Sequence, residues 1–248
     1  MQPFSFKSFE NKTTSEFVPL EKENIMNAIV FGATGLVGKE LVKALEKRKE
    51  INSIILVSRR KSGIPGKKLR EILYDNTEEL SKIKIEKADL AFCAVGSTLK
   101  KAGSVQKFYE IDHDLCITFA QIAHKSGVQS FVYVSSVGAN SKKKNYYLRT
   151  KGKTEEDLKT IFGDQLKIVR PSILLGEREE FRLGEAFGKI MMQLISPMLW
   201  GQSKKYKAVH AKEVAQAMIQ IALSKPKKTI FASHELIELE KDKKNDKT

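Results

Sequence analysis

The feature that most constrains the fold of this chain is an apolar run that leads through three evenly spaced glycines into a helical pattern. Residues Ala28 to Phe31 are continuously apolar, as expected of a strand that is covered on both faces. Gly32, Gly35 and Gly38 follow, and apolar residues then recur at helical spacing from Leu36 to Leu45. A strand that turns through glycines directly into a helix predicts the first unit of a parallel α/β sheet.

The same alternation of strands and helices continues along the chain, and it predicts an α/β fold with a doubly wound, Rossmann-type parallel sheet and helices on both faces. The length of 248 residues requires only one domain, placed here at 26–240 with a small C-terminal, substrate-side extension over 171–240. Residues 1–25 are expected to form a flexible leader and 241–248 a charged tail. The expected strands are 28–31, 53–58, 71–74, 88–95, 131–135 and 166–169, and the expected helices are 36–45, 105–126, 147–160, 187–199 and 212–223.

The glycine turn has the features of a phosphate-binding loop. Gly32 permits the tight turn, Gly35 lets a pyrophosphate approach the backbone, and Gly38 lets the helix pack close to the sheet. The free amides and the dipole at the N-terminus of that helix attract anionic phosphates. The spacing is GxxGxxG rather than GxGxxG, and glycines also serve ordinary turns, so the flanking strand and helix carry the prediction of a dinucleotide site.

The end of the second expected strand indicates which dinucleotide binds. An acidic residue in this position would bond the ribose 2′-hydroxyl of NAD and repel the extra phosphate of NADP. The stretch from Val57 to Arg60 contains no carboxylate and ends in two arginines, Arg59 and Arg60. Guanidinium groups bind phosphate through paired hydrogen bonds. The sequence therefore favours NADP(H), although a pair of solvated arginines at a strand end is the alternative.

A tyrosine and a lysine lie four residues apart in a later expected helix. Tyr147 and Lys151 share one helix face at this spacing. A free phenol, with a pKa of about 10, exchanges protons poorly at neutral pH, and a nearby ammonium lowers that value. Tyr147 can therefore donate a proton to a carbonyl that receives hydride, while Lys151 can also bond the nicotinamide ribose. Tyr146 is a rival phenol, but only Tyr147 has a lysine four residues later.

Such a pair is common on helix surfaces, so its position after the glycine turn and after a strand ending in Ser135 and Ser136 carries the argument. In this order the motifs resemble the short-chain dehydrogenase/reductase superfamily. The resemblance is to its atypical branch, close to the NAD(P)H-binding family of the HIV Tat-interactive oxidoreductases. It extends from Asn27 to Glu240 through the segments GATGLVG, SRR, CAVGST, KAG, YVSSVGA, YLRTKG and RPSILLGEREEFRLGE.

The resemblance implies a role for each residue that it covers. Tyr147 is the implied proton donor and acceptor, Lys151 is its partner, and Ser136 orients the carbonyl. Ser135 is then a structural hydroxyl at the strand end. The implied cofactor contacts are Gly32, Thr34, Gly35, Leu36, Val37 and Gly38 at the phosphates, Arg59 and Arg60 at the 2′-phosphate, Asp75 near the adenine, Val95 and Gly96 at the ribose and nicotinamide, and Leu174 and Arg182 over the nicotinamide end.

The chain departs from the typical superfamily pattern in three places. Ala94 to Ser97 replace the usual Asn-Asn-Ala-Gly segment, and Asp112 occupies the helix position that often carries a catalytic asparagine. Ser136 also lies eleven residues before Tyr147, which is a shorter gap than usual. A four-residue proton relay is therefore not expected to operate unchanged.

Composition sets the remaining expectations. Cys93 and Cys116 lie in apolar patterns and are expected to be buried free thiols, which indicates a reducing, cytoplasmic location. No apolar run is long enough to cross a membrane, and no paired Cys or His spacing predicts a metal site. The net charge of +14 is dispersed and lacks interleaved aromatic residues, so no specific nucleic-acid partner is expected.

Together these features predict an NADP(H)-dependent oxidoreductase that reduces a small-molecule carbonyl, or oxidises the alcohol, with a Tyr–Lys proton relay. The alternative is a non-catalytic NADPH-binding redox sensor or scaffold that acts through a protein partner. The departures at Ala94 and Asp112 favour the alternative, and the ordered motifs favour the enzyme. The sequence leaves the substrate and the oligomeric state open.

Overall fold

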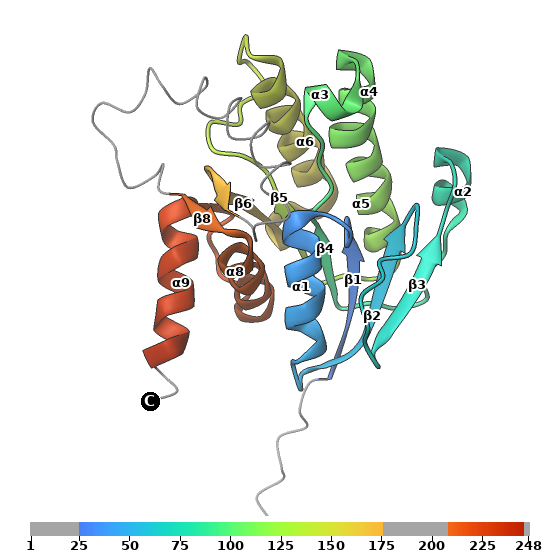
Figure 1. Ribbon diagram of the computed structural model, residues 1–248, viewed down its shortest axis with the longest axis vertical. Coiled ribbons are helices and arrows are strands. Elements are labelled where there is room, and N and C mark those ends of the chain that lie inside the picture. The colour runs from blue at the N-terminus through green and yellow to red at the C-terminus, as the bar shows by residue number, and fades with distance from the viewer. Residues whose placement is uncertain (1–24, 176–207, 246–248) are drawn as a thin grey trace, which may run out of the picture.

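Seven parallel strands form one sheet through the middle of the molecule (Figure 1). The computed structural model describes residues 25–175 and 208–245. In sheet order the strands are β3 (Leu69–Leu73), β2 (Ile51–Ser58), β1 (Met26–Phe31), β4 (Leu90–Cys93), β5 (Ser130–Val134), β6 (Leu166–Arg170) and β9 (Ile230–Ala232). The direction of winding reverses between β1 and β4, which is the arrangement of a doubly wound Rossmann-type sheet. The predicted fold class is confirmed.

Helices cover both faces of the sheet (Figure 1). The longer ones are α1 (Leu36–Glu46), α8 (Ala211–Ser224) and α9 (Ser233–Asn245) on one face, and α5 (Leu115–Lys125) and α6 (Tyr146–Phe162) on the other. Strand β1 shows why its sequence is continuously apolar. Its Ala28 and Val30 pack in one core, and its Ile29 and Phe31 pack in the other.

The single long helix expected over 105–126 is interrupted by one wide turn. It consists of α4 (Val105–Tyr109), the π-helical turn η1 (Glu110–Asp114) and α5. A π turn keeps the chain helical and is only one turn long, so spacing over the whole segment did not reveal it. The helix ends as expected, because Gly127 has a φ of 77° in the left-handed region, where glycine caps helices.

Beyond Pro171 the sequence analysis missed β9 and α9. A three-residue strand is too short for its alternation to show, and α9 is rich in charged residues. Helix α9 extends to Asn245, so residues 241–245, expected in the charged tail, are helical. The remaining short elements are α2 (Thr77–Lys82), α3 (Leu99–Ala102), η2 (Gly163–Gln165), and the two strands of a second parallel sheet, β7 (Leu174–Leu175) and β8 (Val209–His210).

Several expectations fall on segments that the structure leaves undescribed. They are residues 1–24 of the leader expected over 1–25, the helix at 187–199 and the cofactor contact at Arg182. Over 25–175 and 208–245, no helix combines the length and apolar character needed to cross a membrane.

The glycine turn is fixed by close contacts between backbone segments. Gly32 has a φ of 84°, and a Cβ there would lie 2.6 Å from the carbonyl carbon of Ala94 at the end of β4. A Cβ on Gly38 would lie 2.0 Å from the carbonyl oxygen of Gly32. Neither position can accept a side chain unless the backbone moves. The turn therefore joins α1 to the ends of β1 and β4 at the point where the sheet reverses.

We expect Gly38→Ala to lower the free energy of unfolding by about 3 kcal/mol, because the new methyl group meets a backbone oxygen and not a flexible side chain. Glu40→Ala on the same helix is the control, since it removes only a surface ion pair with Lys43 and should change stability by less than about 0.5 kcal/mol. Urea unfolding of both variants measures the difference. Equal stabilities would show that the turn tolerates a side chain at Gly38.

Candidate active site

The N-terminus of α1 is built to receive an anion. Gly35 is its N-cap and supplies no side-chain hydrogen bond, and the first turn of the helix carries no acidic residue. Within residues 25–175 and 208–245 the first amides of the helix therefore have no capping side chain, and the helix dipole adds partial positive charge. This end of α1 lies beside the end of β4, at the reversal of the sheet, where nucleotides bind in folds of this type. The residues present fit the phosphates of a dinucleotide.

The predicted phosphate-loop residues differ in which of their groups are accessible to a ligand. Thr34, Gly35 and Leu36 are half-buried at the turn. The side chain of Val37 is only 5% exposed and belongs to the core around α1. Val37 can therefore contribute its backbone amide to a ligand but not its side chain.

The two predicted 2′-phosphate ligands follow β2 directly. Arg59 and Arg60 are both exposed, and within the described ranges neither forms an ion pair. The Ser58 hydroxyl donates a hydrogen bond of 2.7 Å to the Arg60 carbonyl and holds this turn. Burial raises the pKa of Tyr74, and Arg59 is near enough to oppose that rise. Asp75, the predicted adenine neighbour, is exposed next to Tyr74 and donates its amide to Glu79.

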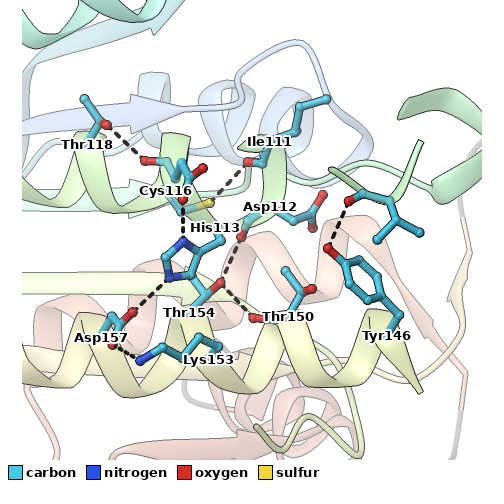
Figure 2. A network of polar contacts seen from close by, with 12 residues as sticks. Ile111, Asp112, His113, Cys116, Thr118, Tyr146, Thr150, Lys153, Thr154 and Asp157 are labelled. Atoms are coloured by element: carbon cyan, nitrogen blue, oxygen red, sulfur yellow. Dashed lines mark hydrogen bonds and ion pairs between the residues drawn. The ribbon is translucent and has the colours of Figure 1, made fainter. Parts of the chain in front are cut away.

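Tyr147 and Ser136 meet at the C-terminal edge of β5. Tyr147 is half-buried at the start of α6, and its side chain hydrogen-bonds with that of Ser136. The alternative phenol, that of Tyr146, has a different partner. Its hydroxyl donates a hydrogen bond of 2.9 Å to the carbonyl of Val105 (Figure 2). Of the two adjacent tyrosines, only Tyr147 shares a hydrogen bond with the predicted substrate-orienting serine.

Lys151 is buried, and its ammonium contacts groups inside the protein. Nζ lies 2.9 Å from Oδ1 of Asp112, and it donates hydrogen bonds to the Tyr133 hydroxyl at 3.0 Å and to the Val134 carbonyl at 3.4 Å. Asp112 is 0% exposed, and the side chain of Lys151 is 4% exposed. The predicted bond from Lys151 to a nicotinamide ribose would require the ammonium to exchange one of these contacts.

The electrostatics of this group follow from burial and from the buried ion pair. Burial raises the pKa of Tyr147, Lys151 lowers it, and the Asp112 carboxylate raises it again. Burial disfavours the charged form of Lys151, but Asp112 outweighs this effect and raises the pKa of Lys151 well above its ordinary range. At neutral pH Lys151 is therefore an ammonium, and Tyr147 is a protonated phenol.

The loop after β4 lies directly over the ion pair. A Cβ on Gly96 would lie 3.4 Å from Oδ1 of Asp112 and 3.5 Å from Nζ of Lys151. The amide of Ser97 donates a hydrogen bond of 2.7 Å to the other oxygen of Asp112. Gly96 is exposed and Val95 half-buried, so the predicted ribose and nicotinamide contacts lie at the surface immediately above Lys151.

The position of Asp112 depends on η1 and its contacts with α6. The single hydroxyl hydrogen of Thr154 is shared between the carbonyl oxygens of Asp112, at 3.0 Å, and Thr150, at 2.9 Å. Both contacts are drawn in Figure 2. The ring of His113 contacts Asp157 on α6 at 2.9 Å. These contacts attach the π turn to the helix that carries Lys151. Turns of this kind occur frequently at functional sites.

Sequence reasoning missed a second buried charge pair near the site. Glu155 on α6 accepts hydrogen bonds from the guanidinium of Arg170 at the end of β6 and from the hydroxyl of Ser135. Ser135 is thus occupied in a structural network, while the adjacent Ser136 faces Tyr147. The sequence did contain one indication that Glu155 lies near the site. It follows Lys151 by four residues and so shares its helix face.

The last predicted contact, Leu174, is half-buried in β7 and pairs in register with Val209 of β8. The structure therefore brings the glycine turn, the loop at Gly96, Ser136, Tyr147 and Lys151 to one edge of the sheet. Arg59, Arg60 and Asp75 follow the neighbouring strands at the same edge.

A family comparison decides what kind of protein has this arrangement. Residues 28–232 match the model of the NAD dependent epimerase/dehydratase family. The chain belongs to that family. It is a member of the short-chain dehydrogenase/reductase superfamily, as the sequence motifs implied. Membership supports an oxidoreductase-type function that depends on NAD or NADP.

Curated relatives correct one expectation. The mitochondrial protein FMP52 of Meyerozyma guilliermondii is 40% identical over 156 residues, which are 62% of this chain and 67% of that protein. FMP52 of Eremothecium gossypii, also named as mitochondrial, is 31% identical over 221 residues, which are 87% of this chain and 98% of that protein. The expected cytoplasmic location is wrong on this evidence, because buried free thiols do not identify a compartment when burial alone protects them.

Solved structures share the fold at low sequence identity. A short chain dehydrogenase family protein from Francisella tularensis has a TM-score of 0.60 and 17% identity, covering 82% of this chain and 93% of that one. The Bordetella bronchiseptica enzyme WbmF, solved in complex with NAD+, has a TM-score of 0.58 and 14% identity, covering 91% of this chain and 80% of that one.

We expect Glu155→Gln to lower the free energy of unfolding by about 2 kcal/mol, because it leaves the partly buried Arg170 without its carboxylate. The matched control is Glu156→Gln on the same helix, where an exposed carboxylate that accepts from Ser141 is lost at a cost below about 0.5 kcal/mol. Chemical denaturation of the two variants compares them. Similar midpoints would mean that the Glu155 network adds no stability.

Proposed function

We propose that this protein is an NADP(H)-dependent oxidoreductase that reduces a carbonyl group by hydride transfer. The observation that carries the proposal is the convergence of Tyr147, Ser136 and Lys151 beside the glycine turn. Ser136 comes from one sequence motif and Tyr147 and Lys151 from another. Together they form a proton donor, a hydroxyl that can orient a carbonyl, and a nearby cation. From the names of its relatives we also infer that the protein acts in mitochondria.

In the proposed reaction the residues of this chain handle the proton. A bound nicotinamide dinucleotide supplies the hydride. Ser136 donates a hydrogen bond to the carbonyl oxygen and holds it near Tyr147, whose phenol then transfers its proton to that oxygen as negative charge develops. The raised pKa of Tyr147 suits this direction, because the phenol carries a proton to give at neutral pH. Lys151 stabilises the phenolate that remains.

The preference for NADP(H) is supported by the turn after β2. Arg59 and Arg60 are exposed there, and no carboxylate lies between Val57 and Lys61. The family name and the WbmF complex refer to NAD, so this chain would differ from those relatives at the 2′-phosphate. The two exposed guanidinium groups provide the charge and the paired donors that an additional phosphate needs.

One observation favours the second candidate function, a non-catalytic NADPH-binding sensor or scaffold. Lys151 contacts Asp112, Tyr133 and Val134, and all of these contacts are internal. If the ammonium keeps them when a dinucleotide binds, it cannot also bond the ribose. Tight NADPH binding without turnover on a panel of aldehydes and ketones would support this candidate over the reductase.

Replacing Tyr147 by Phe should lower the turnover of any carbonyl substrate by about 100-fold or more, since the proton donor is lost. NADPH affinity should change little, because the ring is retained. The control is Tyr146→Phe, which removes a similar hydroxyl whose hydrogen bond goes to the Val105 carbonyl and should leave turnover within about twofold. Steady-state oxidation of NADPH measures both variants. Equal residual rates in the two would refute the role of Tyr147.

The double replacement of Arg59 and Arg60 by Ala should weaken NADPH binding by about 10- to 100-fold, the value of one or two charge-assisted hydrogen bonds. NADH binding should be nearly unchanged, because NADH has no 2′-phosphate. Lys61→Ala, an exposed cation next in the chain, serves as the control. Titration calorimetry with both dinucleotides distinguishes the outcomes. A wild-type preference for NADH would remove the role given to the arginines.

A further inference from the structure

The two predicted 2′-phosphate ligands lie at the start of a long connection between β2 and β3. Parallel neighbours are usually joined through a helix, but residues 59–68, all of which the structure describes, form none. Gly63, Pro65 and Gly66 lie within this connection, and glycines add conformational freedom to a chain. Arg59 and Arg60 therefore depend on contacts from other segments to be ordered before a ligand binds.

Ser58 fixes the first end of this connection. Its carbonyl accepts a hydrogen bond of 3.2 Å from the amide of Tyr74, which follows β3. Its hydroxyl donates a hydrogen bond of 2.7 Å to the carbonyl of Arg60. The next residues, 59–61, are all exposed and all cationic, and they are called the basic turn below. The basic turn therefore begins at a point that is attached to the sheet.

Glu71 fixes the other end of the basic turn. It is a half-buried residue of β3, where it pairs in register with Leu56 of β2. Its Oε1 accepts a hydrogen bond of 3.1 Å from the amide of Ser62 and another from the hydroxyl of the same residue. The Ser62 hydroxyl oxygen also accepts from the amide of Ile64 at 3.2 Å. One carboxylate oxygen thus holds the backbone immediately after the basic turn.

This contact leaves the charge of the basic turn available. Over residues 25–175 and 208–245, Glu71 forms no ion pair, and neither do Arg59 and Arg60. The carboxylate holds the turn through Ser62, so the guanidinium groups are not neutralised by it. A phosphate that binds to donors already held in place loses less free energy to ordering them.

We propose that Glu71 is a positioning residue for the dinucleotide, which holds the basic turn in place through Ser62 and on which the preference for NADP(H) over NAD(H) depends. This role rests on the proposed function, in which Arg59 and Arg60 bind the 2′-phosphate. It adds a residue from a neighbouring strand that does not touch the cofactor. The order of the basic turn, and not only its charge, then determines the preference.

The test is titration calorimetry of the full chain with NADPH and with NADH. Glu71→Ala should weaken NADPH binding by about 10-fold, because the freed turn must be ordered when the phosphate binds. NADH affinity should stay within about twofold, because NADH has no 2′-phosphate to bind the turn. Glu71→Gln keeps an acceptor oxygen for both Ser62 donors, so it should retain NADPH affinity within about threefold.

Glu46→Ala is the matched control, because it loosens the opposite end of the same connection. The Glu46 carboxylate accepts from the amides of Lys67, at 2.6 Å, and Lys68, at 3.2 Å. These contacts lie next to β3 and away from the basic turn. The ratio of NADPH affinity to NADH affinity should therefore stay within about twofold of the wild type.

Limited digestion with trypsin measures the order of the basic turn without any cofactor. Trypsin cleaves after arginine and lysine, and the basic turn consists of these residues. Cleavage at residues 59–61 should be at least about fivefold faster in Glu71→Ala than in the wild type, because mobile exposed segments are cut first. Glu71→Gln should be cleaved at the wild-type rate.

If Glu71→Ala does not fold, Ser62→Ala tests the same contact from its other side. It removes the hydroxyl and keeps the amide, so NADPH binding should weaken by about threefold. The role of Glu71 is overturned if the folded variant keeps wild-type NADPH affinity, or if NADPH and NADH affinities fall equally. Loss of the preference in Glu71→Gln or in Glu46→Ala to the same extent as in Glu71→Ala also overturns it.

Failure of the proposed function gives a different pattern. A wild-type protein that does not prefer NADPH removes both the cofactor assignment and the role of Glu71. A wild-type preference that Glu71→Ala leaves unchanged rejects the role of Glu71 alone. A preference that falls in Glu71→Ala, in a protein that reduces no carbonyl, retains the role of Glu71 and rejects the reductase.

Discussion

The contact between the glycine turn and the end of β4 connects the fold of this protein to its site. Gly32 and Ala94 approach so closely that no side chain fits between them, which fixes β1 and β4 as neighbours where the sheet changes direction. The N-terminus of α1 and the loop at Gly96 consequently lie at the same edge. The same loop also covers the buried pair of Asp112 and Lys151, because a Cβ on Gly96 would contact both side chains.

Much of this arrangement could be predicted from the sequence, for identifiable reasons. Ala28 to Phe31 are apolar on both faces, so they had to form a central strand, and the glycines after them predicted the turn. The spacing of Tyr147 and Lys151 predicted one helix face. Periodicity did not predict the π turn at Asp112, since it is a single turn of five residues within a run that is otherwise α-helical. It also could not show where the Lys151 ammonium points, because that depends on Asp112, Tyr133 and Val134 from three other segments.

Local geometry explains why neighbouring residues of the same type have different tasks here. Ser135 and Ser136 follow a strand, where successive side chains point to opposite sides. One bonds Glu155 and the other meets Tyr147. Tyr146 and Tyr147 are separated by about 100° around α6, so one phenol reaches Val105 while the other reaches Ser136. In each pair one residue bonds to the surrounding structure, and its neighbour lies at the candidate site.

The two buried charged residues of α6 also have different partners. Helix α6 carries Lys151 and Glu155 one turn apart, and each is compensated by a different element, η1 for Lys151 and β6 for Glu155. A charge that is paired inside the protein keeps its ionisation state over a wide pH range. A group in water is screened from other charges, so its pKa stays near its ordinary value. Tyr147 lies between these regimes, because it is half-buried and feels both members of the Lys151–Asp112 pair. Burial raises the pKa of Tyr147, and the two members of the pair then act on it in opposite directions.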